Sequence, residues 1–384
     1  MTPAPLAVTF VVDYLATGGA ERHAVTLANS LDREGFAVSF VRLKPGGALE
    51  PLLDTRNLVA FECAEVATKL DFPAIDRLAA HLRRTACQAV VAANPYATLY
   101  AMLAARRVEP HPVVVSTFHS TIMPGAKNQL QMLFYRGMYL FCDSLVYVCA
   151  NQRDYWRRRA LRARSESVIH NGIDVEHFSA KIPLDDAVDL RARLGFGAAD
   201  LVVGICAVLR PEKAHTDLLE AVARLRREGL QVRCLVIGDG PERLRVETDI
   251  ERLNLGLSAV ITGYQMDVRP YVDACDVLVL ASHSVETFSL SALESMAMGK
   301  PMVMTRTGGA SEQVIDAHNG FLYEPGDIAA LAVHLRKFAD RGMARKMGGN
   351  AAAVVRERFT LQRMTDAYAG LLKRLGAGSR FSRR

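Results

Sequence analysis

The fold of this chain is decided by residues Val277 to Thr305, which read VLVLASHSVETFSLSALESMAMGKPMVMT. The first four of these residues and the segment Pro301 to Thr305 are short apolar runs, which are typical of strands buried on both faces. Between the two runs, Ser289 and Ser291 are both candidate caps of a helix. Because neighbouring parallel strands need a crossover connection of this kind, the stretch predicts a parallel sheet covered by helices.

The same alternation of strand and helix patterns extends over nearly the whole chain, in two series. The first series has expected strands at Ala7–Val12, Ala37–Leu43, Ala89–Ala92, Val113–Thr117 and Leu145–Val148, with helices at Ala20–Arg33, Pro73–Thr85 and Ala97–Arg107. The second adds strands at Leu201–Val208, Val232–Ile237 and Ala259–Thr262. Each half therefore predicts an α/β domain with a doubly wound parallel sheet.

A polar segment from Glu176 to Asp200 separates the two series and carries Asp185, Asp186 and Asp189. We place the domain boundary there, since a chain of 384 residues favours about two domains. The expected parts are an N-terminal domain, a C-terminal domain, a final helix and a basic tail that we expect to be flexible, at residues 1–178, 179–360, 361–376 and 377–384.

The composition is that of a soluble globular protein, with 50% hydrophobic and 23% charged residues. No apolar run approaches the roughly 18 residues that span a bilayer. The apolar start from Leu6 to Val12 follows no basic residue, so it predicts a buried strand rather than a signal peptide. The seven cysteines form no C-x-x-C pair and no zinc-ligand spacing, which favours free thiols in a reducing cytoplasm and no structural metal.

The net charge of +6 is unevenly distributed, because six arginines crowd residues 153–164. Such a run is either a solvated face or a site of attraction to an anionic surface such as a membrane. The preceding segment Leu130 to Cys142 is rich in Met, Leu, Phe and Tyr, which fits either a core helix or a membrane-docking surface. The chain has no nucleic-acid-binding motif, so nucleic acid is not an expected partner.

Ligands of doubly wound sheets bind beyond the carboxyl ends of the strands, so the candidate residues are those that follow strands. Gly18 and Gly19 lie between a strand and a helix, where backbone N–H groups can approach an anion. His119 follows another strand and can hydrogen-bond a sugar hydroxyl or a reacting group. The alternatives are an ordinary loop and a surface histidine.

Two further loops in the C-terminal half carry candidates. Arg210 and Lys213 suit a diphosphate. The alternative is surface charge at the start of a helix, but cations are slightly unfavourable at a helix N-terminus, which favours the functional interpretation. Gly238 opens a segment with the first two glycines of a dinucleotide fingerprint, but Arg243 occupies the third glycine position. This departure argues against NAD, and a tight turn is the other interpretation.

The central stretch adds two carboxylates, Glu286 in a loop and Glu294 in the next helix. One can accept hydrogen bonds from sugar hydroxyls and the other can hold a ribose, while the N–H groups of residues 288–290 can meet a pyrophosphate. The alternative is structural, since Ser291-x-x-Glu294 has the pattern of a capping box.

In their order and spacing, these motifs resemble the retaining glycosyltransferases of family 4, which have the two-domain GT-B fold. The resemblance covers almost the whole chain. It is carried by Gly18-Gly19-Ala20-Glu21-Arg22, His119, Asn171-Gly172-Ile173-Asp174, Arg210-Pro211-Glu212-Lys213, Gly238-Asp239-Gly240-Pro241, the two glutamates, and Gly308-Gly309 with Glu312.

The resemblance implies two facing Rossmann-like domains with a cleft between them and a final helix that crosses back to the N-terminal domain. It also implies a role for each candidate. His119 and Glu286 would act on the sugar at the reaction centre, and Gly18 and Gly19 would form the phosphate and acceptor loop. The donor would be bound by Arg210, Lys213, Gly238, Phe288, Ser289, Leu290 and Glu294.

Two positions depart from the family pattern. The family's usual phosphate-binding arginine is replaced by Val208, and Arg210 stands two residues later. Ser289 occupies the position of a usual glycine, where the amides approach phosphate.

The resemblance implies a hexosyltransferase that needs no metal or other cofactor. The expected donor is a UDP- or GDP-linked sugar, and the acceptor is a glycan or a lipid-linked molecule in polysaccharide or glycolipid biosynthesis. The expected location is cytoplasmic, with peripheral association at an anionic membrane. The alternatives are a sugar-nucleotide epimerase of similar fold and a non-catalytic sugar-nucleotide-binding protein.

Overall fold

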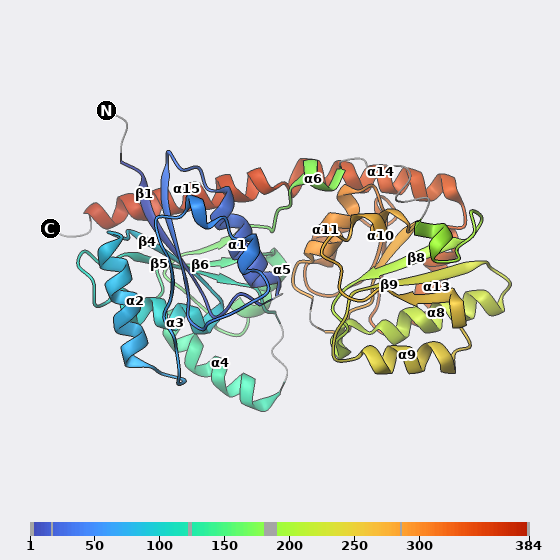
Figure 1. The fold of residues 1–384 in the computed structure, drawn as a ribbon, viewed down its shortest axis with the longest axis horizontal. Coiled ribbons are helices and arrows are strands. Elements are labelled where there is room, and N and C mark those ends of the chain that lie inside the picture. The colour runs from blue at the N-terminus through green and yellow to red at the C-terminus, as the bar shows by residue number, and fades with distance from the viewer. Residues whose placement is uncertain (1–3, 17, 122–124, 180–189, 285, 382–384) are drawn as a thin grey trace. The chain divides into compact units, whose positions relative to one another are not determined.

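The computed structural model describes residues 4–16, 18–121, 125–179, 190–284 and 286–381. The chain divides into two compact units (Figure 1): unit 1 contains residues 1–171 and 361–384, and unit 2 contains residues 172–360. The three aspartates of the expected boundary segment and the last three residues of the expected basic tail lie outside the described residues.

Unit 1 is built on a seven-stranded sheet with the order β3-β2-β1-β4-β5-β6-β7, in which every neighbouring pair is parallel. Its strands are β1 (Leu6–Val12), β2 (Phe36–Arg42), β3 (Phe61–Cys63), β4 (Ala89–Ala93), β5 (Val113–Phe118), β6 (Ser144–Tyr147) and β7 (Glu166–Val168). Its helices are α1 (Gly19–Ser30), α2 (Phe72–Arg84), α3 (Asn94–Ala105), α4 (Ala126–Tyr139), α5 (Ala150–Arg157) and α15 (Leu361–Phe381).

Unit 2 has a six-stranded parallel sheet with the order β10-β9-β8-β11-β12-β13. Its strands are β8 (Leu201–Cys206), β9 (Val232–Ile237), β10 (Ala259–Ile261), β11 (Val277–Leu280), β12 (Met302–Thr305) and β13 (Gly320–Tyr323). Its helices are α6 (Val175–Ser179), the short 3₁₀ helix η3 (Pro211–Lys213), α8 (His215–Arg227), α9 (Arg243–Arg252), α10 (Arg269–Asp273), α11 (Leu290–Ala297), α12 (Ala310–Gln313), α13 (Ile328–Lys337) and α14 (Arg341–Arg358).

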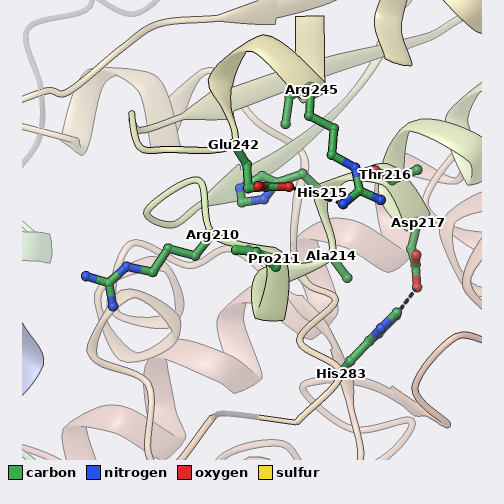
Figure 2. Close-up of a pocket in the computed structure, with 10 residues that line it drawn as sticks. Arg210, Pro211, Ala214, His215, Thr216, Asp217, Glu242, Arg245 and His283 are labelled. Atoms are coloured by element: carbon green, nitrogen blue, oxygen red, sulfur yellow. Dashed lines mark hydrogen bonds and ion pairs between the residues drawn. The ribbon is translucent and has the colours of Figure 1, made fainter. Parts of the chain in front are cut away.

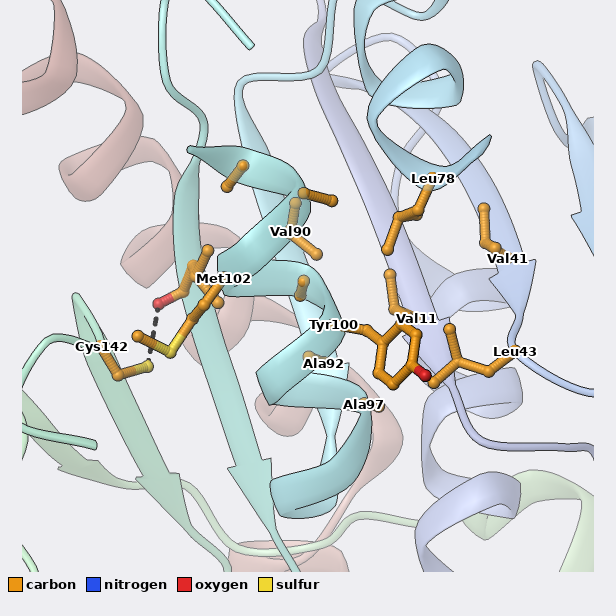
Figure 3. Close-up of a cluster of buried hydrophobic side chains, with 14 of the residues drawn as sticks. Val11, Val41, Leu43, Leu78, Val90, Ala92, Ala97, Tyr100, Met102 and Cys142 are labelled. Carbon is orange, nitrogen blue, oxygen red and sulfur yellow. Dashed lines mark hydrogen bonds between the residues drawn. The ribbon is translucent and has the colours of Figure 1, made fainter. Parts of the chain in front are cut away.

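The side chains of β1 alternate between two apolar clusters on opposite faces of the sheet. Val11 belongs to the cluster under α2 and α3, together with Leu78 and Tyr100 (Figure 3). Phe10 and Val12 belong to the cluster that α1 and α15 cover. Because both faces of the strand are buried, its sequence is apolar on both faces except for Thr9, whose buried hydroxyl is hydrogen-bonded to that of Ser39.

The last helix, α15, is part of unit 1. Its buried face consists of four apolar residues at helical spacing, Met364, Tyr368, Leu371 and Leu372. The hydroxyl of Ser30 in α1 is 2.8 Å from that of Thr365, so a hydrogen bond joins the two helices. The helix continues to Phe381, past the expected end at residue 376.

The doubly wound α/β fold predicted for both halves is confirmed. Each sheet runs outward in one direction through its first three strands and then in the other through the remaining ones. The direction changes between β1 and β4 in unit 1 and between β8 and β11 in unit 2. At such a point, the loops that leave the two strands diverge, which makes it the usual ligand position in open α/β sheets.

We expect Leu372→Ala to lower the free energy of unfolding of unit 1 by about 2–5 kcal/mol, because it leaves a cavity under α15. The fluorescence of Trp156, the single tryptophan and a buried residue of unit 1, reports this transition in urea. Leu257→Ala in unit 2 is the control, since Leu257 is 87% exposed. An unchanged midpoint for Leu372→Ala would show that α15 does not support unit 1.

Candidate functional site

The candidate site of unit 2 lies at its switch point, where two loops leave the carboxyl ends of neighbouring strands. The loop after β8 contains Arg210 and then η3, which ends at Lys213. The loop after β11 contains Glu286 and leads into α11. Sequence reasoning placed both loops at the same edge of one sheet, and the structure brings two of their side chains into contact.

Lys213 and Glu286 form an ion pair, with 2.6 Å between Nζ and Oε2. The side chains are only 21% and 10% exposed, so the two charges are partly removed from water. The hydroxyl of Ser282 donates a second hydrogen bond, of 3.3 Å, to the same carboxylate oxygen. A charge-assisted contact of this kind is stronger than one between neutral groups, and it holds the two loops together.

The loop after β11 is also attached to α8. The backbone N–H of His283 donates to the carbonyl of Glu212 at 3.0 Å. The His283 Nε2 lies 2.6 Å from the Asp217 carboxylate in the first turn of α8 (Figure 2). Glu286 is therefore carried by a loop with several fixed points, and its carboxylate has a defined position.

A third loop, after β12, contacts the backbone of Glu286 and Thr287. Gly308 has a φ of +52°, and a side chain there would collide with the carbonyl oxygen of Glu286. The N–H of Gly309 donates to the carbonyl of Thr287 at 2.7 Å. The close approach of these two loops is thus what requires glycine at Gly308.

The helix α11 begins at the cap residue Ser289, whose hydroxyl accepts a 3.2 Å hydrogen bond from the N–H of Ala292. The buried Gln313 fixes the cap residue by bonding both its N–H and its carbonyl. Ser291 lies inside the helix, so the capping box expected as an alternative at Ser291-x-x-Glu294 is absent. Glu294 is only 3% exposed. Because it takes no part in a capping box, capping does not explain why this carboxylate is buried.

Two further candidates of unit 2, Phe288 and Gly238, make other contacts. The side chain of Phe288 packs edge-to-face on Phe359, with 5.3 Å between the rings. Gly238 has a φ of +144°, and a side chain there would collide with the carbonyl of Ala207. Glycine is therefore needed at Gly238 because the loops after β8 and β9 touch there, and its backbone N–H donates to the carbonyl of Gly263 at 3.1 Å.

A pocket of about 270 Å³ lies between η3, α8 and α9. Its lining includes His215, Asp217, Glu242, Arg245 and His283 (Figure 2). Among the candidates for donor binding, Arg210 lines this pocket, and its side chain extends away from the other residues drawn in Figure 2. The pocket is thus adjacent to the switch point but does not contain the ion pair.

In unit 1, His119 follows β5, and its backbone N–H donates to Asn94 Oδ1 at 3.3 Å. Its ring lies 4.7 Å from that of the buried His23 in α1, which in turn lies 5.4 Å from the ring of Tyr368 in α15. Burial, and then the neighbouring His23, hold the pKa of His119 well below its usual range. The imidazole at the end of β5 is therefore neutral at physiological pH.

His23 and Tyr368 were not among the sequence candidates. Both ring nitrogens of His23, Nε2 of His119 and the hydroxyl of Tyr368 are buried and have no hydrogen-bond partner among the described residues. Unpaired buried groups are costly, and those around His119 mark this cluster as more than packing. Only the chemical character of His23, a polar residue in an apolar helix face, could have indicated it.

The glycine loop before α1 has room for a side chain at Gly19 but not at Gly18. Gly18 is the cap residue of α1, and a side chain there would collide with the carboxylate of Glu21. A side chain at Gly19 would meet nothing within 4 Å. Burial raises the pKa of Glu21. Thr17, which precedes the glycines, lies outside the described residues.

Both halves of the chain match family models. Residues 17–177 match the family described as Glycosyltransferase Family 4, and residues 188–354 match Glycosyl transferases group 1. The putative glycosyltransferase EpsD of Bacillus subtilis is 28% identical over 291 residues, which are 73% of this chain and 75% of EpsD.

Other curated relatives are matched over about half their length. The lipopolysaccharide core biosynthesis glycosyltransferase LpsE of Rhizobium meliloti is 33% identical over 188 residues, or 48% of this chain and 53% of LpsE. A D-inositol 3-phosphate glycosyltransferase of Streptomyces bingchenggensis is 32% identical over 202 residues, or 48% of this chain and 43% of that enzyme.

The fold also matches solved structures over almost the whole chain. HepE of Anabaena, crystallised in complex with UDP, has a TM-score of 0.85 at 24% identity and covers 96% of this chain and 100% of its own. A glycosyltransferase of Rickettsia africae has a TM-score of 0.82 at 20% identity, covering 97% and 98%. The two units thus have the GT-B fold of glycosyltransferases. With family models on both units, the chain belongs to the glycosyltransferases of family 4 type.

Two properties of the described residues bear on possible partners. None of the helices has both the length and the apolar character that a crossing of the membrane requires. In the same residues, no three His, Cys, Asp or Glu side chains gather so that they could hold a metal ion.

We expect Gly308→Ala to displace the backbone of Glu286 and to weaken the binding of a UDP-sugar or GDP-sugar at least tenfold. Gly326→Ala is a matched control, because Gly326 has a φ of +78° and a side chain there would meet nothing within 4 Å. Both variants carry the strain of a positive φ, but only the first one has the collision. Equal binding of the nucleotide sugar by the two variants would contradict this role of Gly308.

We expect His23 to make unit 1 less stable in acid. Burial lowers the pKa of His23 to about 4, whereas an unfolded chain has a histidine pKa of about 6.5. The unfolded state therefore binds the proton first, and stability falls as the pH drops from about 6.5 to about 4. In the His23→Leu variant, the free energy of unfolding should fall less over this range than in the wild type, by a difference of up to roughly 3 kcal/mol. Urea midpoints followed by Trp156 fluorescence measure the difference, and identical pH slopes would contradict it.

Proposed function

We propose that the protein transfers a hexosyl group from a UDP- or GDP-linked sugar to a hydroxyl of a glycan or a lipid-linked acceptor, with retention of configuration and without a metal or other cofactor. The observation that supports this best is the ion pair of Lys213 and Glu286 at the switch point of unit 2. It combines a cation for a diphosphate with a carboxylate for sugar hydroxyls in one place.

In this proposal, the donor replaces the internal ion pair. The diphosphate carries the greater negative charge and takes the ammonium of Lys213, and Glu286 then accepts hydrogen bonds from the sugar hydroxyls. The start of α11, at Phe288, Ser289 and Leu290, adds the positive end of the helix dipole, and the N–H of Ser289 would leave Gln313 to bind the diphosphate. Because Ser289 caps this helix with its hydroxyl, its departure from the usual glycine leaves the helix start intact.

Arg210 has the role of a second cation. Val208 and Arg210 are exposed while Leu209 between them is buried, which is the alternation of an extended chain. The side chain of Arg210 therefore leaves the backbone on the same side as that of Val208, where the family has its usual arginine. Glu294, buried in α11, is assigned to the ribose hydroxyls, and Gly238 acts through the shape of its loop.

The proposed reaction is attack of the acceptor on the face from which the diphosphate departs. The bond between the anomeric carbon and the diphosphate oxygen breaks, a bond to the acceptor oxygen forms, and the acceptor proton passes to the departing phosphate. Lys213, Arg210 and the α11 amides stabilise the charge that develops on the diphosphate. His119, contributed by unit 1, is neutral and can hydrogen-bond the sugar without competing for the diphosphate; Gly18 and Gly19 provide backbone N–H groups for phosphate or acceptor.

The known relatives support the class of donor and of product. HepE has been crystallised with UDP-glucose, and LpsE is described as an enzyme of lipopolysaccharide core biosynthesis. We therefore place the protein in the synthesis of a cell-surface polysaccharide or glycolipid, on the cytoplasmic face of a membrane with anionic lipids. An epimerase or a non-catalytic binding protein would behave differently, because neither forms a glycosylated acceptor.

We expect Lys213→Ala and Glu286→Gln each to lower kcat/KM for sugar transfer about 100-fold or more, since each removes a group that acts on developing charge or on sugar position. Product analysis with and without acceptor measures transfer and detects epimerisation of the donor. Lys337→Ala is the control, because Lys337 lies on α13 over the ring of Phe321. Wild-type transfer by a folded Lys213→Ala variant would exclude the proposed site.

A further inference from the structure

The helix α4 of unit 1 is apolar on two faces. Its inward face contributes Met132, Tyr135 and Tyr139, which are at most 4% exposed. Its outward face carries Leu130, Leu133 and Phe134, which are 70%, 56% and 60% exposed. These three residues have the spacing of neighbours on a helix surface, so they form one stripe.

The stripe continues past the end of the helix. Leu140 and Phe141 are 55% and 57% exposed. The guanidinium of Arg106 lies over the ring of Phe141 at 5.8 Å. Single exposed apolar residues are normal on a soluble protein, but a contiguous patch of this kind marks a surface that binds something. We call Leu130, Leu133, Phe134, Leu140 and Phe141 together the α4 stripe.

Positive charge is concentrated in the same part of the chain. Residues 126–164 contain eight Lys or Arg against Asp143 and Asp154, and no Glu. Their net charge therefore equals the +6 of the whole chain, so the remaining residues are neutral in sum. The positive charge of this protein belongs to α4, α5 and the turns around them.

The two helices are neighbours in the fold. Met132 and Tyr139 of α4 and Trp156 of α5 belong to the same apolar cluster. The ring of Phe118 lies 6.1 Å from Tyr139 and 5.3 Å from Trp156, so it connects the two helices. The helices that carry the α4 stripe and the arginines thus pack on the same apolar cluster of unit 1.

Only part of the arginine charge is neutralised within the protein. Arg153 pairs with Asp154, Arg157 with Glu166, and Arg164 with Asp143. Arg159 is exposed and stacks on the ring of Tyr155, with 3.6 Å to its centroid. Arg158 is exposed as well. Exposed guanidinium groups on α5, together with exposed Leu and Phe on α4, give the composition that binds the interface of an anionic bilayer.

We propose that the α4 stripe and the arginines of α5 dock unit 1 on an anionic lipid bilayer, with the apolar side chains at the boundary of headgroups and acyl chains. We choose a bilayer as the occupant because the net charge of residues 126–164 has one sign, as attraction to anionic headgroups requires. The inference rests on the membrane part of the proposed function. It is tested without donor or acceptor, so its failure leaves sugar transfer in unit 2 untouched.

The test is co-sedimentation of the full-length protein with vesicles of phosphatidylglycerol and phosphatidylcholine, and with vesicles of phosphatidylcholine alone. We expect binding to the anionic vesicles at low salt and partial release at high salt, because salt screens the arginines. The double variant Leu133→Ser/Phe134→Ser should lose at least tenfold in bound fraction. The matched control is Leu244→Ser/Leu257→Ser in unit 2, whose residues are 76% and 87% exposed and which should bind as the wild type does.

The charge is tested separately by Arg158→Glu/Arg159→Glu, which should lose the preference for anionic vesicles. Thermal unfolding of each variant should match the wild type, because the replaced side chains are exposed. Absence of binding to anionic vesicles at low salt, or equal binding by the Leu133→Ser/Phe134→Ser variant, would overturn the proposal. A wild-type dimer in solution that this variant converts to a monomer would assign the stripe to a second copy of the chain and would also overturn it.

Discussion

The contact between Lys213 and Glu286 joins the loops of β8 and β11, the two strands at which the sheet of unit 2 changes direction. A partly buried ion pair adds little stability, because the cost of removing the charges from water offsets their attraction. The surrounding structure nevertheless fixes it from several sides, through Ser282, the His283–Asp217 contact and the close approach of Gly308. Such support is better explained by a need to position both charges than by stability.

The same contact explains why a missing arginine is tolerable. Val208 removes one cation from the family pattern, but Lys213 remains in place and Arg210 emerges on the side of Val208. The cap of helix α11, Ser289, follows Glu286 by three residues and is fixed by Gln313. The cations and the helix start together provide positive potential at one edge of the sheet, which is where parallel α/β sheets hold phosphates.

The sequence was sufficient to predict the fold, because buried parallel strands are continuous apolar runs that are hard to mistake. It missed β3, β7 and β13, since the first two have only half-buried residues and the third begins at a glycine. The loops of the site were predicted from their place after strands. The choice between Ser289 and Ser291 as cap could not be made, because both have the right chemistry. Gln313, His23 and Tyr368 were missed because their partners lie far away in sequence.

The central claim is that the diphosphate of the donor replaces Glu286 as the ion-pair partner of Lys213. A crystal structure of the protein with a bound UDP-sugar or GDP-sugar tests it most directly. The account predicts a diphosphate oxygen about 3 Å from Nζ of Lys213, with the Glu286 carboxylate turned to the sugar hydroxyls. A nucleotide sugar bound instead in the pocket between α8 and α9, with the contact of Lys213 and Glu286 intact, would contradict it.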